Sequence, residues 1–265
     1  MKVVTRYPDG IFSWVDLGTT DIEASKTFYS SLFGWSFLDV PTDSGVVYSM
    51  GQIEGYDVAG LGPMDPDMQA QGAPPFWTAY IKHDDVDAVA ARVTEAGGNV
   101  MMPPMDVMDS GRMTIIQDPA GAMFGVWQPK AHIGAKLVNI PNTLVWNELQ
   151  TTDIDGAKAF YTAVFDWTYR VNEQGYVACK TDDRIQAGMM QIDESWGEVP
   201  PNWSNYFLVD EIEAKVEKVK ELAGNVIVPP TPAGEMGKFS VIQDPQGGHF
   251  NIIEYFAPAD PPPDH

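Results

Sequence analysis

The chain has 265 residues, of which 44% are hydrophobic, and its 37 Asp and Glu outnumber its 16 Lys and Arg to give a formal net charge of −21. Such an acidic field repels phosphate backbones and so argues against nucleic acid as a partner; it favours solubility or, alternatively, a pocket for a cationic small molecule. No apolar run is long enough to span a bilayer and the N-terminus lacks the hydrophobic core of a signal peptide, so we expect no membrane partner and a cytoplasmic location, with signal-less export left open.

The first predicted elements are a strand over 12–18 and a helix that follows it with Asp21 as its N-cap. The apolar residues of this helix fall on one stripe, which consists of Ile22, Phe28, Tyr29, Leu32 and Phe33. Gly34 is a suitable C-terminal stop. Two short strands are expected next, around 46–50 and 58–61, between Gly, Asp and Pro turns.

A proline-rich connector over 63–75 leads to a second set of similar elements. Strands are expected at 77–81, 112–117 and 123–128. A helix starts near Asp84 and ends at 97–98, and its inward residues are predicted to be Val86, Val89, Ala90 and Val93. The sequence Asp-Pro-Ala-Gly at 118–121 is typical of a type I turn between the last two strands.

The second half of the chain repeats the first. The segment 12–29 returns at 144–161, and the segment 74–121 returns at 200–247. So long a period indicates a duplicated domain rather than a solenoid, and each half contains the strand–helix–strands unit twice. We therefore expect domains at 1–130 and 143–257, a linker at 131–142 and an unpacked tail at 258–265. Trp35 and Trp167 are predicted core or interdomain anchors, and the single Cys179 a structural thiol.

These repeated motifs resemble the vicinal oxygen chelate superfamily, which includes glyoxalase I, bleomycin-resistance proteins and extradiol dioxygenases. The motifs are the helix start at 21–29, the Asp-Asp-Val-Asp-Ala run at 84–88, the glycines at 97–98 and the turn at 118–121. The similarity extends to two-domain actinobacterial members, among them a mycobacterial culture-filtrate antigen. The resemblance implies an α+β fold with tandem glyoxalase-like domains, in which four βαβββ modules form cup-shaped mixed sheets that hold ligands or metals.

The resemblance also implies where metal ligands would lie. The implied positions are Trp14 and Trp146, Thr78 and Ser204, and Gly125 and Asn251. None of these is a good ligand, and four His in the whole chain do not supply a two-His-one-carboxylate iron site. We therefore expect no cofactor and neither glyoxalase I nor extradiol dioxygenase activity, although Mg²⁺ or Ca²⁺ held by carboxylates alone stays open.

Alternation along strands predicts what lines the cups instead. The predicted ligand-binding residues are Trp14, Asp16, Thr78, Tyr80, Trp127, Trp146, Ser204, Tyr206 and Asn251. Such an aromatic lining suits a flat organic ligand, and the alternative is ordinary core packing. For the carboxylates of Asp16 and Glu148 the alternatives are an ion pair with Arg112 or Lys238, or an exposed strand end.

Glu148 and His249 form the one plausible catalytic acid–base pair, and Met123 replaces the histidine in the first half. If modules paired across the halves, His249 would face Asp16 instead. The function expected is a metal-free protein that binds an aromatic or polyketide-like molecule in antibiotic biosynthesis or resistance, as a monomer of pseudo-dimeric halves or a homodimer. The alternatives are a cofactor-poor lyase, isomerase or hydroxylation accessory enzyme in secondary metabolism or aldehyde detoxification, and a protein recognised through its outer surface.

Overall fold

The computed structural model describes residues 2–42, 45–182 and 184–258. In the first half the strands are β1 (Phe12–Thr19), β2 (Ser36–Pro41), β3 (Val47–Ile53), β4 (Tyr56–Pro63), β5 (Phe76–Lys82), β6 (Asn99–Val107), β7 (Gly111–Gln117) and β8 (Met123–Pro129). The helices of this half are α1 (Ile22–Phe33), α2 (Pro66–Ala70) and α3 (Val86–Glu95). The eight strands form one sheet, sheet A, in the order β2-β3-β4-β1-β5-β8-β7-β6.

The second half repeats this arrangement. Its strands are β9 (Leu144–Thr151), β10 (Thr168–Val171), β11 (Val177–Thr181), β12 (Arg184–Gln191), β13 (Asn202–Leu208), β14 (Asn225–Pro232), β15 (Gly237–Gln243) and β16 (His249–Tyr255). Its helical elements are α4 (Ile154–Phe165), the short 3-10 helix η1 (Glu194–Trp196) and α5 (Ile212–Glu221). They form sheet B, in the order β10-β11-β12-β9-β13-β16-β15-β14.

Both sheets are mixed. In each, the first and fourth strands of a module pair in parallel, as β1 does with β4 and β5 with β8, while β1 and β5 join the two modules antiparallel. Every sheet is thus built from the two modules of one half, so the modules do not pair across the halves. The predicted α+β class, with two tandem domains built from repeated modules, is confirmed.

Local signals explain the helices. Asp21 caps α1 by accepting a hydrogen bond from the Ala24 amide at 3.0 Å, and Gly34 ends the helix in the left-handed region with φ 74°. In α3 the N-cap is Asp85, and the inward residues are those predicted. The two longest helices have 12 residues each, so no helix in the described ranges could cross a membrane.

Some elements were not located from the sequence. The connector over 63–75 contains α2, which Asp65 caps and which starts with Pro66. Strands β2 and β6 lie at the two edges of sheet A and are largely exposed, so their hydrophobic alternation is weak. An edge strand that buries little apolar surface leaves little pattern to find.

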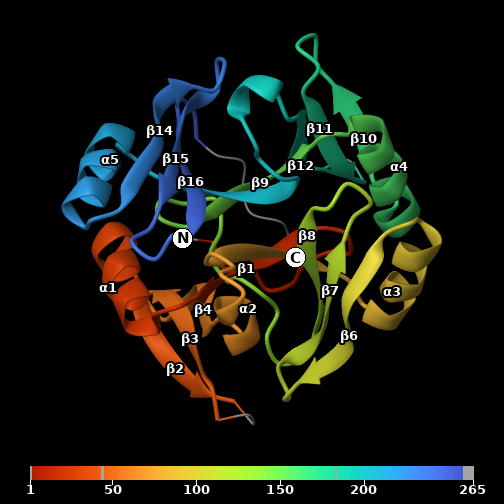
Figure 1. The fold of residues 1–265 in the computed structure, drawn as a ribbon, viewed down its shortest axis with the longest axis horizontal. Helices are drawn as coiled ribbons and strands as arrows, with labels where there is room; N and C mark the ends of the chain where they lie inside the picture. Colours follow the sequence, from red (N-terminus) through yellow and green to blue (C-terminus); the bar gives the residue numbers. More distant parts are fainter. Residues whose placement is uncertain (1, 43–44, 183, 259–265) are drawn as a thin grey trace.

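One continuous core lies between the two sheets. Figure 1 shows α1 beside α5 and α3 beside α4, so that helices from opposite halves fill the space on either side of the central strands. Aromatic side chains cross the interface, as where Phe207 lies 5.3 Å from both Phe33 and Trp77 between ring centroids. The helix-bearing faces therefore meet inside the molecule. The opposite face of each sheet points away from the other sheet and would line the predicted cup. It is called inner face A in sheet A and inner face B in sheet B.

The repeated motifs also hold the halves together. Trp77 donates to the hydroxyl of Tyr29 on α1, which donates to Asp244 of the second half at 2.8 Å. The same relay runs in the opposite direction, from Tyr161 on α4 to Asp118 of the first half at 3.1 Å. The Asp-Pro turns thus accept hydrogen bonds from the partner half as well as shaping their own hairpins.

The predicted anchors occupy this interface. Trp35 and Trp167 are 2% and 1% exposed. Trp35 donates to the carbonyl of Asn142 in the linker at 2.9 Å, and Trp167 donates to the carbonyl of Gly10 at 2.8 Å. Both tryptophans therefore pack as core residues that connect the two halves.

Candidate ligand-binding site

Strand alternation divides the residues of β1 between two environments. Val15 and Leu17 belong to the core between the sheets, whereas Trp14 packs in a separate cluster with Tyr80 and Trp127. In sheet B the corresponding division places Tyr206 and Ile253 together, with Trp146 against them. The predicted aromatic residues therefore gather on inner faces A and B.

A hydrogen-bonded cluster occupies the centre of inner face A. The indole nitrogen of Trp14 donates to the hydroxyl of Tyr48 at 3.0 Å. That hydroxyl donates to Asp16 Oδ2 at 3.1 Å, and the hydroxyl of Tyr80 donates to the same oxygen at 3.1 Å. A single carboxyl group is thus held by two phenols, one of which an indole also contacts.

Inner face B carries the same cluster. Trp146 donates to the hydroxyl of Tyr176 at 3.0 Å. Tyr176 and Tyr206 donate to the two oxygens of Glu148, each at 2.9 Å. Glu148 is longer than Asp16 by one methylene, and each of its oxygens accepts from one tyrosine. The geometry has been preserved through the duplication although the acid differs.

Sequence reasoning missed Tyr48 and Tyr176, which come from β3 and from the turn before β11. The available signal was a pair of glycines. A Cβ atom at Gly60 would lie 1.7 Å from the Tyr48 hydroxyl, and one at Gly188 would lie 1.8 Å from the Tyr176 hydroxyl. The absence of a side chain at these two glycines provides the space that the tyrosine hydroxyls occupy.

The alternative in which Arg112 or Lys238 forms an ion pair with Asp16 or Glu148 is wrong. Arg112 binds Asp87 at 2.9 Å, and Lys238 binds Glu213 at 2.6 Å, both at the exposed ends of strands. A cation on a strand end reaches the nearby helix more easily than the middle of the inner face. Phenol hydroxyls satisfy Asp16 instead, and those of Tyr176 and Tyr206 satisfy Glu148 in the same way.

Burial controls the protonation of these groups. It raises the pKa of Asp16 to about 7, against the opposing effect of hydrogen bonds from Tyr48 and Tyr80. Burial also raises the pKa of Glu148, again opposed by its tyrosines. The pKa values of the tyrosines are raised too, first by burial and then by the neighbouring carboxylate, so their hydroxyls stay protonated and donate. Asp16 can therefore give or take a proton near neutral pH.

The donor set at the implied metal positions does not fit a metal ion. Trp14 and Trp146 present indole N–H groups, which donate hydrogen bonds and have no lone pair for coordination. Gly125 has no side chain, and a Cβ atom there would lie 2.1 Å from the Tyr80 ring. Within the described ranges, no three His, Cys, Asp or Glu residues are grouped so that they could hold a metal.

Glu148 and His249 lie in the same sheet but are not joined by a hydrogen bond in the described part of the chain. Glu148 is opposite Ser204 on β13, and His249 begins β16 with an exposed side chain. The oxygens of Glu148 accept from tyrosines. The two residues thus remain a predicted pair, on strands that β13 separates and without the contact that would orient the imidazole.

The linker makes inner face A different from inner face B. His132 follows β8 and lies 4.6 Å from Trp14 and 5.8 Å from Trp127 between ring centroids. Trp14 is consequently 5% exposed, whereas Trp146 is half-buried. Burial lowers the pKa of His132 to about 4, so its ring is neutral. No role for this histidine could be predicted from the sequence, because only the path of the linker brings it to the sheet.

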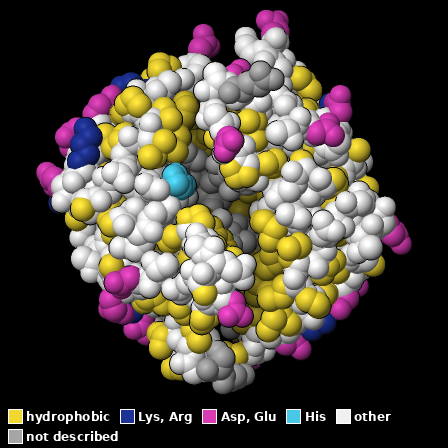
Figure 2. Space-filling view, viewed as in Figure 1, with side chains coloured by type: hydrophobic (Ala, Val, Ile, Leu, Met, Phe, Trp, Pro, Cys, Tyr) yellow, Lys and Arg dark blue, Asp and Glu magenta, His cyan; other side chains and the backbone are white. Residues whose placement is uncertain are grey.

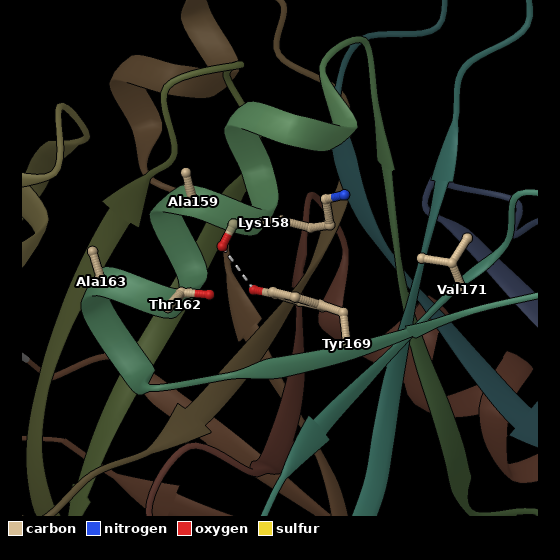
Figure 3. A pocket seen from close by; sticks show the side chains of 6 residues that line it. All are labelled: Lys158, Ala159, Thr162, Ala163, Tyr169 and Val171. Atoms are coloured by element: carbon tan, nitrogen blue, oxygen red, sulfur yellow. Dashed lines mark hydrogen bonds between the residues drawn. The ribbon is translucent and has the colours of Figure 1, made fainter.

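A separate hollow on the outer surface, of about 540 Å³, is drawn in Figure 3. Its lining residues are Lys158, Ala159, Thr162, Ala163, Tyr169 and Val171, from α4 and β10. Tyr169 donates to the carbonyl of Lys158 at 3.0 Å, and no predicted site residue reaches it. It lacks the converging polar groups of a specific site, so the inner faces remain the better candidates.

A duplicated βαβββ sheet with its polar cluster on the inner face defines a two-domain protein of the glyoxalase type. The chain belongs to the Glyoxalase/Bleomycin resistance protein/Dioxygenase superfamily, whose family model matches residues 11–126 and 142–252.

Relatives of similar length support this assignment. The CFP32 proteins of Mycobacterium bovis and Mycobacterium tuberculosis, whose names assign them provisionally as glyoxylases, are 44% identical over 94% of this chain and 97% of their own length. The anthracycline biosynthesis protein DnrV of Streptomyces peucetius is 34% identical over 95% of each chain.

Solved structures show the shared fold at low identity. The Mn(II)-bound glyoxalase of Novosphingobium aromaticivorans is 16% identical, with a TM-score of 0.64 over 95% of this chain and 84% of its own. The 2,3-dioxygenase LapB of a Pseudomonas species also has a TM-score of 0.64 and 16% identity, over 100% of this chain and 96% of its own.

Proposed function

We propose that this protein binds an aromatic, polyketide-like small molecule on its inner faces without using a metal ion. The observation that carries the proposal is the recurrence of one cluster in both halves, in which an indole and two phenols surround a single carboxyl group. A buried carboxyl is costly, and two copies of the same arrangement suit a polar contact at the centre of an aromatic surface.

The nature of the lining supports an aromatic ligand. Rings held rigidly on strands offer offset or edge-to-face contacts, and the carboxyl group adds one directional hydrogen bond. The chain is also 34% identical to proteins named for anthracycline biosynthesis, over 95% of its length. Anthracyclines are multi-ring aromatic polyketides, so this similarity favours a ligand of that kind.

The proposal is tested by ligand binding. Thermal-shift screening and calorimetry with aromatic metabolites and antibiotics should find at least one binder, and Trp14→Ala or Trp146→Ala should weaken it. Trp196→Ala is the matched control, because Trp196 is 40% exposed on η1 and belongs to neither aromatic cluster. An empty screen, or equal affinity in all three variants and the unaltered protein, would contradict the proposal.

A second candidate function is proton-transfer catalysis by a lyase or isomerase, favoured by the pKa of about 7 for Asp16. Any activity found with a bound aromatic compound should then fall in Asp16→Asn. The predicted pair is tested separately with Glu148→Gln and His249→Gln. Unchanged turnover in both of these variants would remove their catalytic roles.

A further inference from the structure

Methionines gather on inner face A. The chain has 13 methionines, and five of them belong to this face: Met50, Met102, Met105, Met113 and Met123. Met50 and Met113 pack directly against the cluster of Trp14 and Tyr80. On β6, Met102 lies opposite Ile115 and Met105 lies opposite Met113, and residues directly opposite each other share a face of the sheet.

The remaining methionine, Met123, lies two residues before Gly125 on β8, and thus on the same face, where a Cβ atom at Gly125 would touch the Tyr80 ring. Two of the five are largely exposed, Met105 at 46% and Met123 at 40%, and the other three are partly buried. Figure 2 shows hydrophobic side chains gathered over β6, β7 and β8, beside the hollow of the visible face. Part of this apolar surface is therefore accessible.

The same positions of sheet B carry other residues. The registers of the two sheets correspond, since Met50 lies opposite Gly60 as Ala178 does opposite Gly188. By the same correspondence of registers, the counterparts of Met102, Met105, Met113 and Met123 are, in that order, Val228, Thr231, Phe239 and His249. The fold therefore accepts smaller, stiffer or more polar side chains at every one of these places, and does not itself require methionine.

Methionine has chemical properties that suit one kind of ligand. Its unbranched thioether adapts to irregular surfaces and makes favourable contacts with aromatic rings. Asp16, which is only partly buried, adds a single hydrogen-bonding group at the centre of this face. The net charge of −21 makes the protein unfavourable for an anion.

We propose that inner face A binds a multi-ring aromatic molecule without negative charge. This molecule packs against the five methionines and forms a hydrogen bond with Asp16. This inference rests on the proposed function and adds which face binds and which chemical class is bound. Inner face B, with His249 and without these methionines, does not take the same ligand.

The experiment uses Nile red, an uncharged multi-ring aromatic dye, with the full-length protein labelled with ¹³C at the methionine methyl groups. Dye binding should shift the signals of the five methionines, each assigned by its Met→Leu variant. The signal of Met189, which is fully buried on the helix-bearing side of sheet B, should stay in place. Shifts that spare the five would overturn the inference.

Matched exchanges between the sheets give an independent readout. Met105→Thr and Met123→His make inner face A resemble inner face B, and should weaken dye binding at least about tenfold together. Val228→Met and Thr231→Met, at the sheet B positions that match Met102 and Met105, are the controls and should leave affinity unchanged. If the controls alone altered binding, the ligand would lie on inner face B, so this inference would fail while the proposed function stood.

Two further outcomes separate the explanations. If neither Nile red nor any compound of the aromatic panel bound, the proposed function itself would fail. If the five signals shifted with protein concentration in the absence of dye, the methionines would form a contact between copies of the chain, and the inference would be overturned.

Discussion

Replacing Asp16 with asparagine should change how the free energy of unfolding depends on pH. The structure raises the pKa of this carboxyl from 3.8 to about 7, because the group is largely removed from water, and hydrogen bonds from Tyr48 and Tyr80 oppose this effect only in part. The folded state therefore binds a proton more tightly than the unfolded chain does. Its contribution to stability is fully present below about pH 4 and is lost as the pH rises through about 7.

The magnitude follows from the size of the shift. Each pKa unit corresponds to about 1.4 kcal/mol, so a shift of about three units is an upper limit of about 4 kcal/mol. The side chain is partly exposed, and the range from about pH 5 to about pH 8 includes only part of the pH range over which this stabilisation is lost. We therefore expect the free energy of unfolding to change by about 2 kcal/mol in that range. Asparagine does not titrate, so the variant lacks this dependence.

The assay is urea unfolding of the wild type and of Asp16→Asn across this range. Other titrating groups are common to both proteins and cancel in the difference. The variant should gain about 2 kcal/mol relative to the wild type as the pH rises from about 5 to about 8. Glu148→Gln, whose carboxyl pKa is also raised by burial, should show the same direction. A difference that stays constant with pH would mean that Asp16 ionises normally in the folded protein.

Three further outcomes test the packing. Tyr29→Phe and Tyr161→Phe each remove an interdomain hydrogen bond to a buried carboxylate and leave an indole N–H unpaired, so each should lower the free energy of unfolding in chemical denaturation by about 2–4 kcal/mol. The control Tyr169→Phe loses only a bond to a backbone carbonyl and should lower it by less than about 1 kcal/mol. Equal losses in all three variants would refute the relay. Burial raises the pKa of the Cys179 thiol, so thiol reagents at neutral pH should label it only on unfolding, and rapid native labelling would contradict its position. Because burial lowers the pKa of His132 to about 4, its ring NMR signals should stay constant from about pH 8 to about pH 5; a midpoint near 6.5 would place the linker elsewhere.

The helices could be predicted because their signals are local. The N-cap Asp21, the apolar stripe and Gly34 lie within one short segment, and each acts through hydrogen bonds or packing inside that segment. The edge strands β2 and β6 could not be located, since a strand exposed on most of its length has no marked alternation. The duplication nevertheless showed which elements of the two halves correspond, because this comparison does not depend on alternation within a strand.

The site was only partly accessible to the same reasoning. Strand alternation placed Trp14 and Asp16 on one face, because a period of two holds wherever a strand is regular. The hydrogen-bond partners of Asp16 depend on neighbouring strands, and Tyr48 reaches it from β3, 32 residues away in the sequence. His132 reaches Trp14 only because the linker turns back over the sheet.

The sequence by itself determined the duplication, the approximate boundaries of α1 and α3 and which strand residues share a face, since these depend on spacing along the chain. Tertiary structure alone decided that each sheet takes both modules from one half, because identical repeats are compatible with either pairing. The choice follows from the direct pairing of β1 with β5 and of β9 with β13, and from the reciprocal bonds of Tyr29 and Tyr161 across the core. The same pairing brings methionines from four separate strands onto one surface, which no local pattern could show.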